Sequence, residues 1–281
     1  MSIKVTVLIE NTTKSHLKSE HGLSLYIEYN GKKLLLDAGS SALFAENAEA
    51  LGIDLSKVET AFLSHGHYDH SGGFAEFARI NKKAGVYAME QAIQDYQSVS
   101  GGTLHGIGIP LEVMEKMQGR FVFVNGVTRV AEGITLVSHS TEGLAQIGEK
   151  AGLYRKQGEE LLPDDFAHEM SLVLETDKGL VICNSCSHGG LQNIVEETKR
   201  VFPGQKIYAY IGGLHMRAVR NGEEICTFGA EELDVLAAYI KECDIQLLYT
   251  GHCTGTPALA LLQERLEERI RGMYTGAEFF F

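Results

Sequence analysis

Apolar residues along the first quarter of the chain follow strand-like and helix-like spacings in turn. Strand patterns occur at residues 5–9, 23–29, 33–36 and 58–63, and a helical pattern at 40–51 ends at Gly52. The second and third strands are joined at Asn30-Gly31, a sequence typical of a tight hairpin turn. The last of these strands leads directly into a polar segment, residues 64–73.

The same regularity returns in the last part of the chain. Strands are predicted at 171–175, 180–183, 207–211 and 245–249, and helices at 191–201, 229–243 and 257–271. Strands separated by helices favour a layered α/β fold with buried sheets. The middle, about 85–158, is less regular, with glycine-rich turns and short strand-like pieces at 121–124 and 134–138. We predict one domain, 1–281, in which this middle is a lid or insert that covers the site.

Four metal-binding side chains are concentrated in the polar segment. It reads Ser-His-Gly-His-Tyr-Asp-His-Ser-Gly-Gly and supplies His65, His67, Asp69 and His70. Imidazole is the commonest protein ligand for zinc, and a carboxylate widens the choice of metal. At a strand end, His65 and His67 point the same way by the period of two, while the other pair follows where the chain turns. The segment therefore predicts a metal site, with one pair for each of two cations.

Composition narrows the class of protein. The formal charge of −12 over 281 residues disfavours nucleic acid and anionic membranes as partners. Apolar runs stay far below the roughly 18 residues that span a bilayer, and the chain opens directly on a strand pattern. Five cysteines, an odd number, do not suggest a disulfide framework. We therefore expect a cytoplasmic protein.

Two later histidines follow predicted strands in the same way. His188 lies in Asn-Ser-Cys-Ser-His-Gly-Gly after the strand at 180–183, and His252 lies in Thr-Gly-His-Cys-Thr-Gly after the strand at 245–249. Chemistry gathers at one end of the strands in open α/β sheets, and the flanking glycines allow close approach of the backbone. We predict that both histidines are metal ligands.

These motifs resemble those of the metallo-β-lactamase superfamily, whose signature is His-x-His-x-Asp-His. Asp37-Ala38-Gly39 is similar to its first motif, in which the aspartate supports the metal loop from behind the ligands. The resemblance implies a four-layer αββα sandwich with a mono- or dinuclear metal centre at one edge. It further implies that His65 and His67 hold the first metal, and that Asp69, His70 and His252 hold the second.

The sequence departs from that family where an aspartate usually bridges both metals. The strand at 180–183 is followed by Cys186 and His188, without an aspartate. His188 is the expected ligand on this side, and Cys186 is either a metal-binding thiolate or a small buried apolar residue. With Glu20-His21-Gly22 and Gly-Gly-Leu-His at 212–215, this loop resembles the 7,8-dihydropterin-6-ylmethyl-4-(β-D-ribofuranosyl)aminobenzene-5′-phosphate synthase-like branch.

Three further histidines are candidates for binding metal or substrate. His215 and His21 lie near predicted strand ends, and His168 precedes a strand, with Asp164 and Glu169 as competing candidates. His16, His105 and His139 are instead expected on the surface or in the lid.

The resemblance and the metal site predict a metal-dependent hydrolase. A metal-activated water would attack an ester, lactone or phosphoester of a small, anionic molecule, with Asp69 orienting the nucleophile or handling a proton. Zinc is the expected cofactor, as one or two ions, with iron or manganese as alternatives. Two other functions stay open: a pterin-related synthase of the methanopterin type, and a di-iron oxidoreductase.

Overall fold

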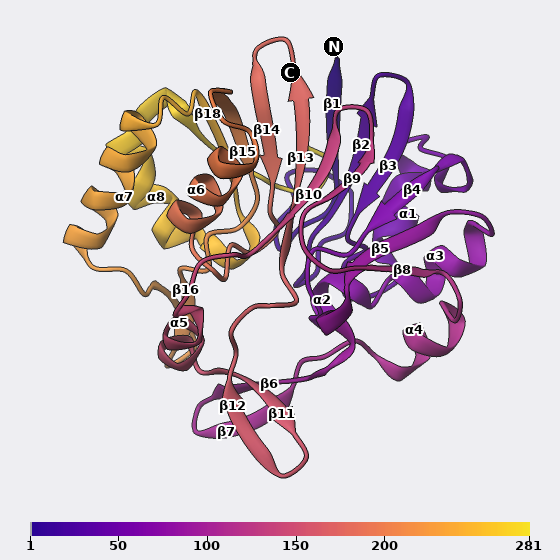
Figure 1. The fold of residues 1–281 in the computed structure, drawn as a ribbon, viewed down its shortest axis with the longest axis horizontal. Coiled ribbons are helices and arrows are strands. Elements are labelled where there is room, and N and C mark those ends of the chain that lie inside the picture. Colours follow the sequence, from indigo (N-terminus) through magenta and orange to yellow (C-terminus); the bar gives the residue numbers. More distant parts are fainter. Residues whose placement is uncertain (1) are drawn as a thin grey trace.

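Two seven-stranded sheets face each other at the centre of the molecule, and helices cover their outer sides (Figure 1). The structure is a computed structural model that describes residues 2–281. The first sheet consists, in spatial order, of β20 (Glu278–Phe280), β1 (Ile3–Ile9), β2 (Ser24–Tyr29), β3 (Lys32–Leu36), β4 (Thr60–Phe62), β5 (Gly85–Met89) and β8 (Phe121–Val124). The second consists of β19 (Ile270–Gly272), β18 (Leu247–Thr250), β15 (Ile207–Ile211), β14 (Gly179–Cys183), β13 (Met170–Thr176), β10 (Ile134–Ser138) and β9 (Thr128–Ala131).

Apolar side chains fill the spaces between these layers. Strand residues such as Val5, Leu25 and Leu172 meet between the two sheets. One outer layer contains α1 (Leu43–Ala50), α3 (Phe74–Ile80) and α4 (Leu111–Lys116), and the other α6 (Leu191–Val201), α7 (Ala230–Glu242) and α8 (Thr256–Leu266). Each outer layer packs on its sheet through its own apolar cluster. Burial of each large aliphatic or aromatic side chain contributes about 1.5–3 kcal/mol. The predicted four-layer αββα sandwich is confirmed.

A smaller four-stranded sheet lies at one end of the sandwich. It pairs two hairpins that are far apart in sequence, β6 (Asp95–Ser100) with β7 (Thr103–Gly106), and β11 (Leu153–Gln157) with β12 (Glu160–Pro163). The stretch predicted as an insert is therefore divided. Its strands β5, β8, β9 and β10 belong to the large sheets because their apolar residues reach the core, and the hairpins form the separate sheet.

The strands that precede the predicted motifs end at the edge nearest this small sheet. Strands β3 and β4 are parallel, and so are β14, β15 and β18. The loops after their carboxyl ends therefore meet between the two sheets. The short helix α2 (Tyr68–Ser71) begins within the polar segment and turns Asp69 and His70 back toward this edge.

The last helix ends earlier than its pattern predicts. Residues 257–271 were expected to be helical, but α8 stops at Leu266, Glu267 adopts a φ of 51°, and β19 pairs in parallel with β18. Burial of Ile270 at the edge of the second sheet outweighs the helical spacing. Among residues 2–281, none of the helices has the length and apolar character that crossing a bilayer requires.

Candidate metal centre

Asp37 is a buried carboxylate that holds the loops of the centre through hydrogen bonds. It follows β3, is fully buried and adopts a φ of 59°. Its carboxylate accepts hydrogen bonds from the Ser64 amide N–H at 2.7 Å and hydroxyl at 2.6 Å, His70 Nδ1 at 2.8 Å, and the Ser185 hydroxyl at 2.6 Å. One carboxylate thereby fixes the loops after β4 and β14. Its position agrees with the supporting role predicted for it.

The structure brings His65, His67 and His188 together as one group of facing ring nitrogens. His65 Nε2 lies 3.3 Å from His188 Nε2, and all three side chains are buried. His67 Nε2 and His188 Nδ1 have no hydrogen-bond partner among the described residues. Buried polar atoms without partners are costly, so this group suits a cation that its nitrogens would coordinate.

Asp69, His70 and His252 form a second group beside the first. His70 Nε2 lies 3.2 Å from His252 Nε2, and Asp69 Oδ2 lies 3.3 Å from His252 Nε2 and 3.5 Å from His70 Nε2. His252 is carried by a 3₁₀ turn after β18, and its φ of 50° aims the ring at α2.

The hydrogen bonds behind the rings show that both groups fit metal ions. His70 Nδ1 donates to Asp37, and His252 Nδ1 donates to Asn11 Oδ1 at 2.9 Å, so the Nε2 atoms of the two rings face each other and both present lone pairs once His70 Nε2 has lost its proton. His65 Nδ1 likewise donates to the Ser64 hydroxyl at 2.8 Å, which frees its Nε2. Lone pairs that face each other at about 3 Å repel unless a cation lies between them. Ligand histidines are typically oriented in this way by partners on their other ring nitrogen.

Charge in the centre is arranged around the carboxylates. Burial lowers the pKa of His67 to about 3, and that of His65 well below its ordinary value, so these rings are neutral ligands at pH 7. Burial also opposes protonation of His70, but Asp69 and Asp37 outweigh it and raise the pKa of His70 to about 9. Burial alone would raise the pKa of Asp69, yet the surrounding histidines hold it below its ordinary value. The second group therefore attracts positive charge, whether a proton or a metal ion.

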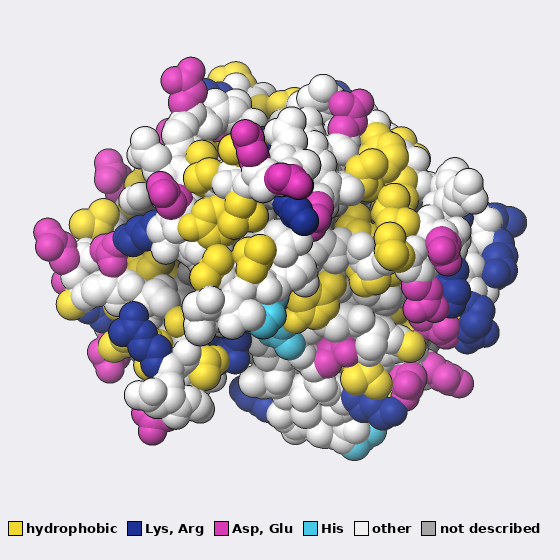
Figure 2. Space-filling model, turned by 90° about the horizontal axis from the view of Figure 1, so that it is seen from below, with side chains coloured by type: hydrophobic (Ala, Val, Ile, Leu, Met, Phe, Trp, Pro, Cys, Tyr) yellow, Lys and Arg dark blue, Asp and Glu magenta, His cyan; other side chains and the backbone are white. Residues whose placement is uncertain are grey.

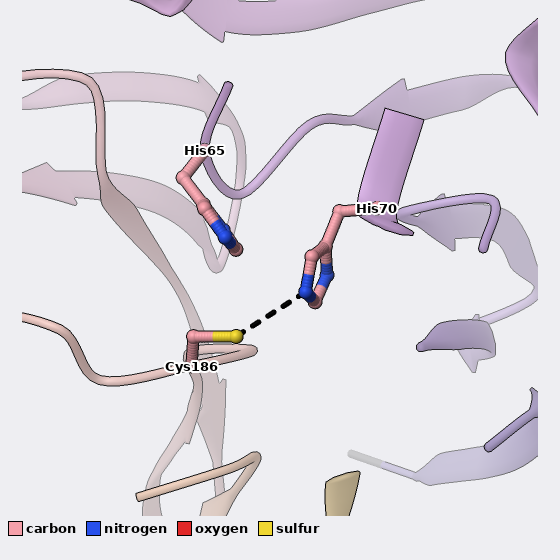
Figure 3. A group of neighbouring side chains, drawn as sticks. All are labelled: His65, His70 and Cys186. Carbon is pink, nitrogen blue, oxygen red and sulfur yellow. Dashed lines mark hydrogen bonds between the residues drawn. The ribbon is translucent and has the colours of Figure 1, made fainter. Parts of the chain in front are cut away.

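Cys186 lies between the two groups. Its Sγ is 3.2 Å from His70 Nε2 and also within reach of the His65 ring, and Figure 3 shows the three side chains pointing toward one another. The residue is buried. It thus lies next to candidate ligand nitrogens of both groups.

The three additional histidine candidates have different surroundings. His21 is half-exposed, with its Nε2 3.3 Å from Asp69 Oδ2 and its ring stacked on His252. The His215 ring lies 4.4 Å from the His188 ring at the edge of the centre. His168 is fully buried and uses both nitrogens, since Nδ1 accepts the Gly66 amide at 2.8 Å and Nε2 donates to an Asp164 oxygen at 3.0 Å. We therefore interpret His168 as a support for the metal loop.

Several supporting residues are absent from the sequence-based prediction. Glu10 and Asn11 follow β1; Glu10 accepts a hydrogen bond from the His252 backbone, and Asn11 accepts one from its ring. The feature of the sequence that could have identified them is their position directly after a strand. His139 was expected on the surface or in the lid, but its ring lies almost buried between Glu169 and Glu197, with hydrogen bonds of 2.6 and 2.9 Å. Both carboxylates accept a hydrogen bond from the ring and favour its charged form, which explains why burial does not neutralise it. His16 and His105 are exposed, as expected.

The centre opens toward the small sheet. Figure 2 looks onto this end of the molecule, and histidine side chains are visible near the middle of the face, beside apolar ones. Tyr96 of β6 stacks on His168 at 3.9 Å and lies 5.9 Å from the His67 ring. The small sheet is therefore in direct contact with the walls of the centre.

Comparison with known proteins gives a consistent result. The sequence profile of the metallo-beta-lactamase superfamily matches residues 19–181. The 7,8-dihydropterin-6-methyl-4-(beta-D-ribofuranosyl)-aminobenzene-5'-phosphate synthase of Methanocaldococcus jannaschii is 30% identical, over 98% of this chain and 95% of its own. A solved metal-dependent hydrolase of the beta-lactamase superfamily has a TM-score of 0.80 at 26% identity, covering 99% of this chain and 98% of that one. Zinc-bound PqqB from Methylobacterium extorquens shares the fold, with a TM-score of 0.58 at 12% identity and coverage of 98% and 99%.

Proposed function

The chain belongs to the metallo-beta-lactamase superfamily, and on that premise we propose that it is a metal-dependent hydrolase of a small, anionic ester, lactone or phosphoester. The observation that carries this proposal is the pair of facing Nε2 atoms in each of the two groups, His65 with His188 and His70 with His252. The Nδ1 atoms of His65, His70 and His252 are hydrogen-bonded, which leaves their Nε2 atoms for a metal ion. His188 Nδ1 has no hydrogen-bond partner among the described residues. This arrangement fits two adjacent cations. Hydrolases that use two neighbouring metals have this type of arrangement.

Each group of residues has a distinct role in this proposal. Bound divalent cations would lower the pKa of water to about 7 and polarise the electrophile. Asp69 is the residue best placed to orient a water molecule or accept its proton, because its carboxylate is buried, ionised and close to the half-exposed His21. Burial lowers the pKa of His21 to about 4, so the ring is neutral at pH 7 and can donate its Nε2–H toward Asp69.

The entrance favours a small substrate with negative charge. His21 and His215 flank it, and the half-buried Arg217 lies close enough to lower the pKa of His21 further. Arg217 forms an ion pair with Glu224, which fixes the guanidinium within the β16 (Arg217–Arg220) and β17 (Glu223–Cys226) hairpin. We propose that this hairpin contacts the anionic part of the substrate.

Reconstitution tests the hydrolase proposal. The protein is stripped of metal with a chelator, reloaded with zinc, manganese or iron, and assayed on panels of esters, lactones and phosphodiesters. We expect turnover that depends on metal, is lost in His188→Ala, and is kept in the exposed control His16→Ala. A protein that binds two metal ions per chain yet turns over none of these panels would contradict the proposal.

The similarity to the archaeal synthase favours a second candidate function. The match, at 30% identity, spans nearly the whole of both chains, so the matched region includes the loops around the centre as well as the sheets. We therefore infer that synthesis of the dihydropterin–ribofuranosylaminobenzene phosphate product is the alternative reaction. Mass spectrometry after incubation with a dihydropterin that carries a leaving group on its 6-methyl carbon and with the aminobenzene ribonucleotide distinguishes the two, since only a synthase releases that group and gives the coupled product.

A further inference from the structure

We propose that Cys253, together with Cys186, supplies sulfur ligands to the second cation, so that this site is a mixed imidazole–thiolate site. The inference rests on the proposed function only in requiring that the centre binds metal. The Sγ atoms of both cysteines and one ring nitrogen of His252 all lie within 4.8 Å of one another. Cys186 Sγ also lies 3.2 Å from His70 Nε2. A cation held by His70 and His252 therefore has two thiols within reach.

The two thiols come from different loops that lie next to each other in the structure. Cys186 lies in the loop after β14, and Cys253 lies in the 3₁₀ turn after β18. The Cys253 Sγ is 3.5 Å from the carbonyl oxygen of Cys186, and the two residues are 9% and 3% exposed. Because the loops follow parallel strands of the same sheet, the sheet itself fixes this separation.

A glycine makes room for the Cys253 sulfur. A Cβ at Gly213 would lie 2.3 Å from Cys253 Sγ, so any larger residue there would displace the thiol. The Gly213 amide donates to the Ser185 carbonyl at 2.7 Å, which holds the backbone against the loop that carries Cys186. The position of the sulfur is thus determined by close backbone packing on both sides.

Cys183 shows what a purely structural cysteine looks like in this fold. It is fully buried in β14, three residues before Cys186, and belongs to the apolar cluster between the sheets. Cys186 and Cys253 instead adjoin imidazole nitrogens and polar backbone. Their surroundings are those of ligands, and Cys183 is a matched control.

Sulfur ligands would determine which metals the second site accepts. Thiolates favour zinc and iron, while carboxylate and water ligands suit magnesium and manganese. Each thiol that binds loses its proton to solvent as the metal–sulfur bond forms, so metal uptake would release protons. The site would therefore discriminate against the hard cations that an all-oxygen or nitrogen–oxygen site accepts.

Cobalt substitution tests this inference without relying on activity. Metal-free protein is loaded with Co²⁺ under anaerobic conditions, and the near-ultraviolet sulfur-to-cobalt charge-transfer band is recorded. We expect the band in the parent protein and in Cys183→Ala, about half of its intensity in Cys253→Ser or Cys186→Ser, and none in the double variant. Zinc X-ray absorption should show a sulfur shell at about 2.3 Å in the parent protein, distinct from nitrogen at about 2.0–2.1 Å.

The outcomes separate this inference from the proposed function. An unchanged band in a folded Cys253→Ser variant, verified by circular dichroism, would overturn the role of Cys253. A parent protein without any charge-transfer band but with zinc-dependent hydrolysis would overturn the sulfur site and leave the hydrolase proposal standing. A sulfur band without hydrolysis of any substrate panel would support the sulfur site and contradict the proposed function. If Cys253→Ser does not fold, Gly213→Ala supplies the second test, because it should displace the sulfur and weaken the band.

Discussion

The carboxylate of Glu169 holds the backbone that carries His188. Its Oε1 accepts the His188 amide N–H at 2.9 Å, and its Oε2 accepts the Gly189 amide at 3.1 Å. The same Oε2 also accepts a hydrogen bond from His139 Nε2 at 2.6 Å. The main chain of a candidate metal ligand is therefore positioned by a buried ion pair whose two members belong to neither group.

Glu169→Gln should weaken metal binding while leaving every candidate ligand in place. The amide keeps one acceptor oxygen but loses the charge that pairs with His139, so the loop that carries His188 is less firmly held. Loss of an outer partner of this kind typically costs 10–100-fold in metal affinity, and we expect about that increase in the zinc dissociation constant. Competition with a chromophoric chelator measures it. Glu196→Gln, an exposed change on α6, should leave the constant unchanged; an equal effect there would contradict the prediction.

Stability should fall at alkaline pH because of His139. Burial opposes its charge, but hydrogen bonds to Glu169 and Glu197 outweigh burial and raise its pKa from 6.5 to about 10. A raised pKa means that the folded state binds the proton more tightly than the unfolded chain. The stabilisation is therefore fully present below pH 6.5 and is lost as the pH rises through about 10.

Urea denaturation of the parent protein and His139→Gln across this pH range measures the effect. Removal of one partner of a buried pair costs about 3–5 kcal/mol, so His139→Gln should be less stable by about that amount at pH 6. The difference between the two proteins should shrink toward pH 10. A difference that does not depend on pH would show that the ring contributes by packing alone. His105→Gln, on the exposed face of β7, is the control.

Metal counting distinguishes the two ligand groups. His188→Ala removes a nitrogen from the first group and His252→Ala removes one from the second, so each variant should bind one cation fewer per chain than the parent protein. Elemental analysis of purified, zinc-equilibrated protein gives the ratio, with His16→Ala as the exposed control. Retention of both cations in His188→Ala would contradict the assignment of His188 to the first cation.

Gly66→Ala should destabilise the segment between the candidate ligands His65 and His67. A Cβ at this position would lie 2.2 Å from the carbonyl oxygen of Ala92, and the Gly66 amide N–H must also reach His168. Backbone cannot yield as a flexible side chain can, so we expect a loss of about 1–3 kcal/mol in the free energy of unfolding. Gly106→Ala in β7, where a Cβ meets nothing closer than 3.7 Å, should change stability little. Chemical denaturation of the two variants provides the comparison.

The sequence was most informative where chemistry follows a strand. His65, His188 and His252 each come directly after an apolar run, and parallel strands bring such positions to one edge, so the structure places them together. The layered fold could be predicted for the same reason, because each strand and helix carries its own local periodicity. Asp37 was identified from its motif, and the structure shows the four hydrogen bonds that explain its place.

Features that depend on long-range packing could not be predicted in this way. His139, Glu169 and Glu197 are separated by up to 58 residues, and no local pattern indicates that their side chains meet. The sequence does not distinguish Cys253 from an ordinary small apolar cysteine, and only its proximity to Cys186 and His252 in the structure does so. The predicted end of the last helix was wrong because the pairing of β19 with β18 is a tertiary interaction that helical spacing does not reveal.

The small sheet beside the centre also limits how this scaffold can be altered. Its hairpins come from segments about fifty residues apart and are joined by pairing of β6 with β11, in which Tyr96 lies opposite Arg155. A graft of only one hairpin from a relative would leave unmatched backbone next to His67 and His168, and such a chimera should be less stable than one that exchanges both, as thermal denaturation would show. The two hairpins therefore form one structural unit, and its two parts must change together.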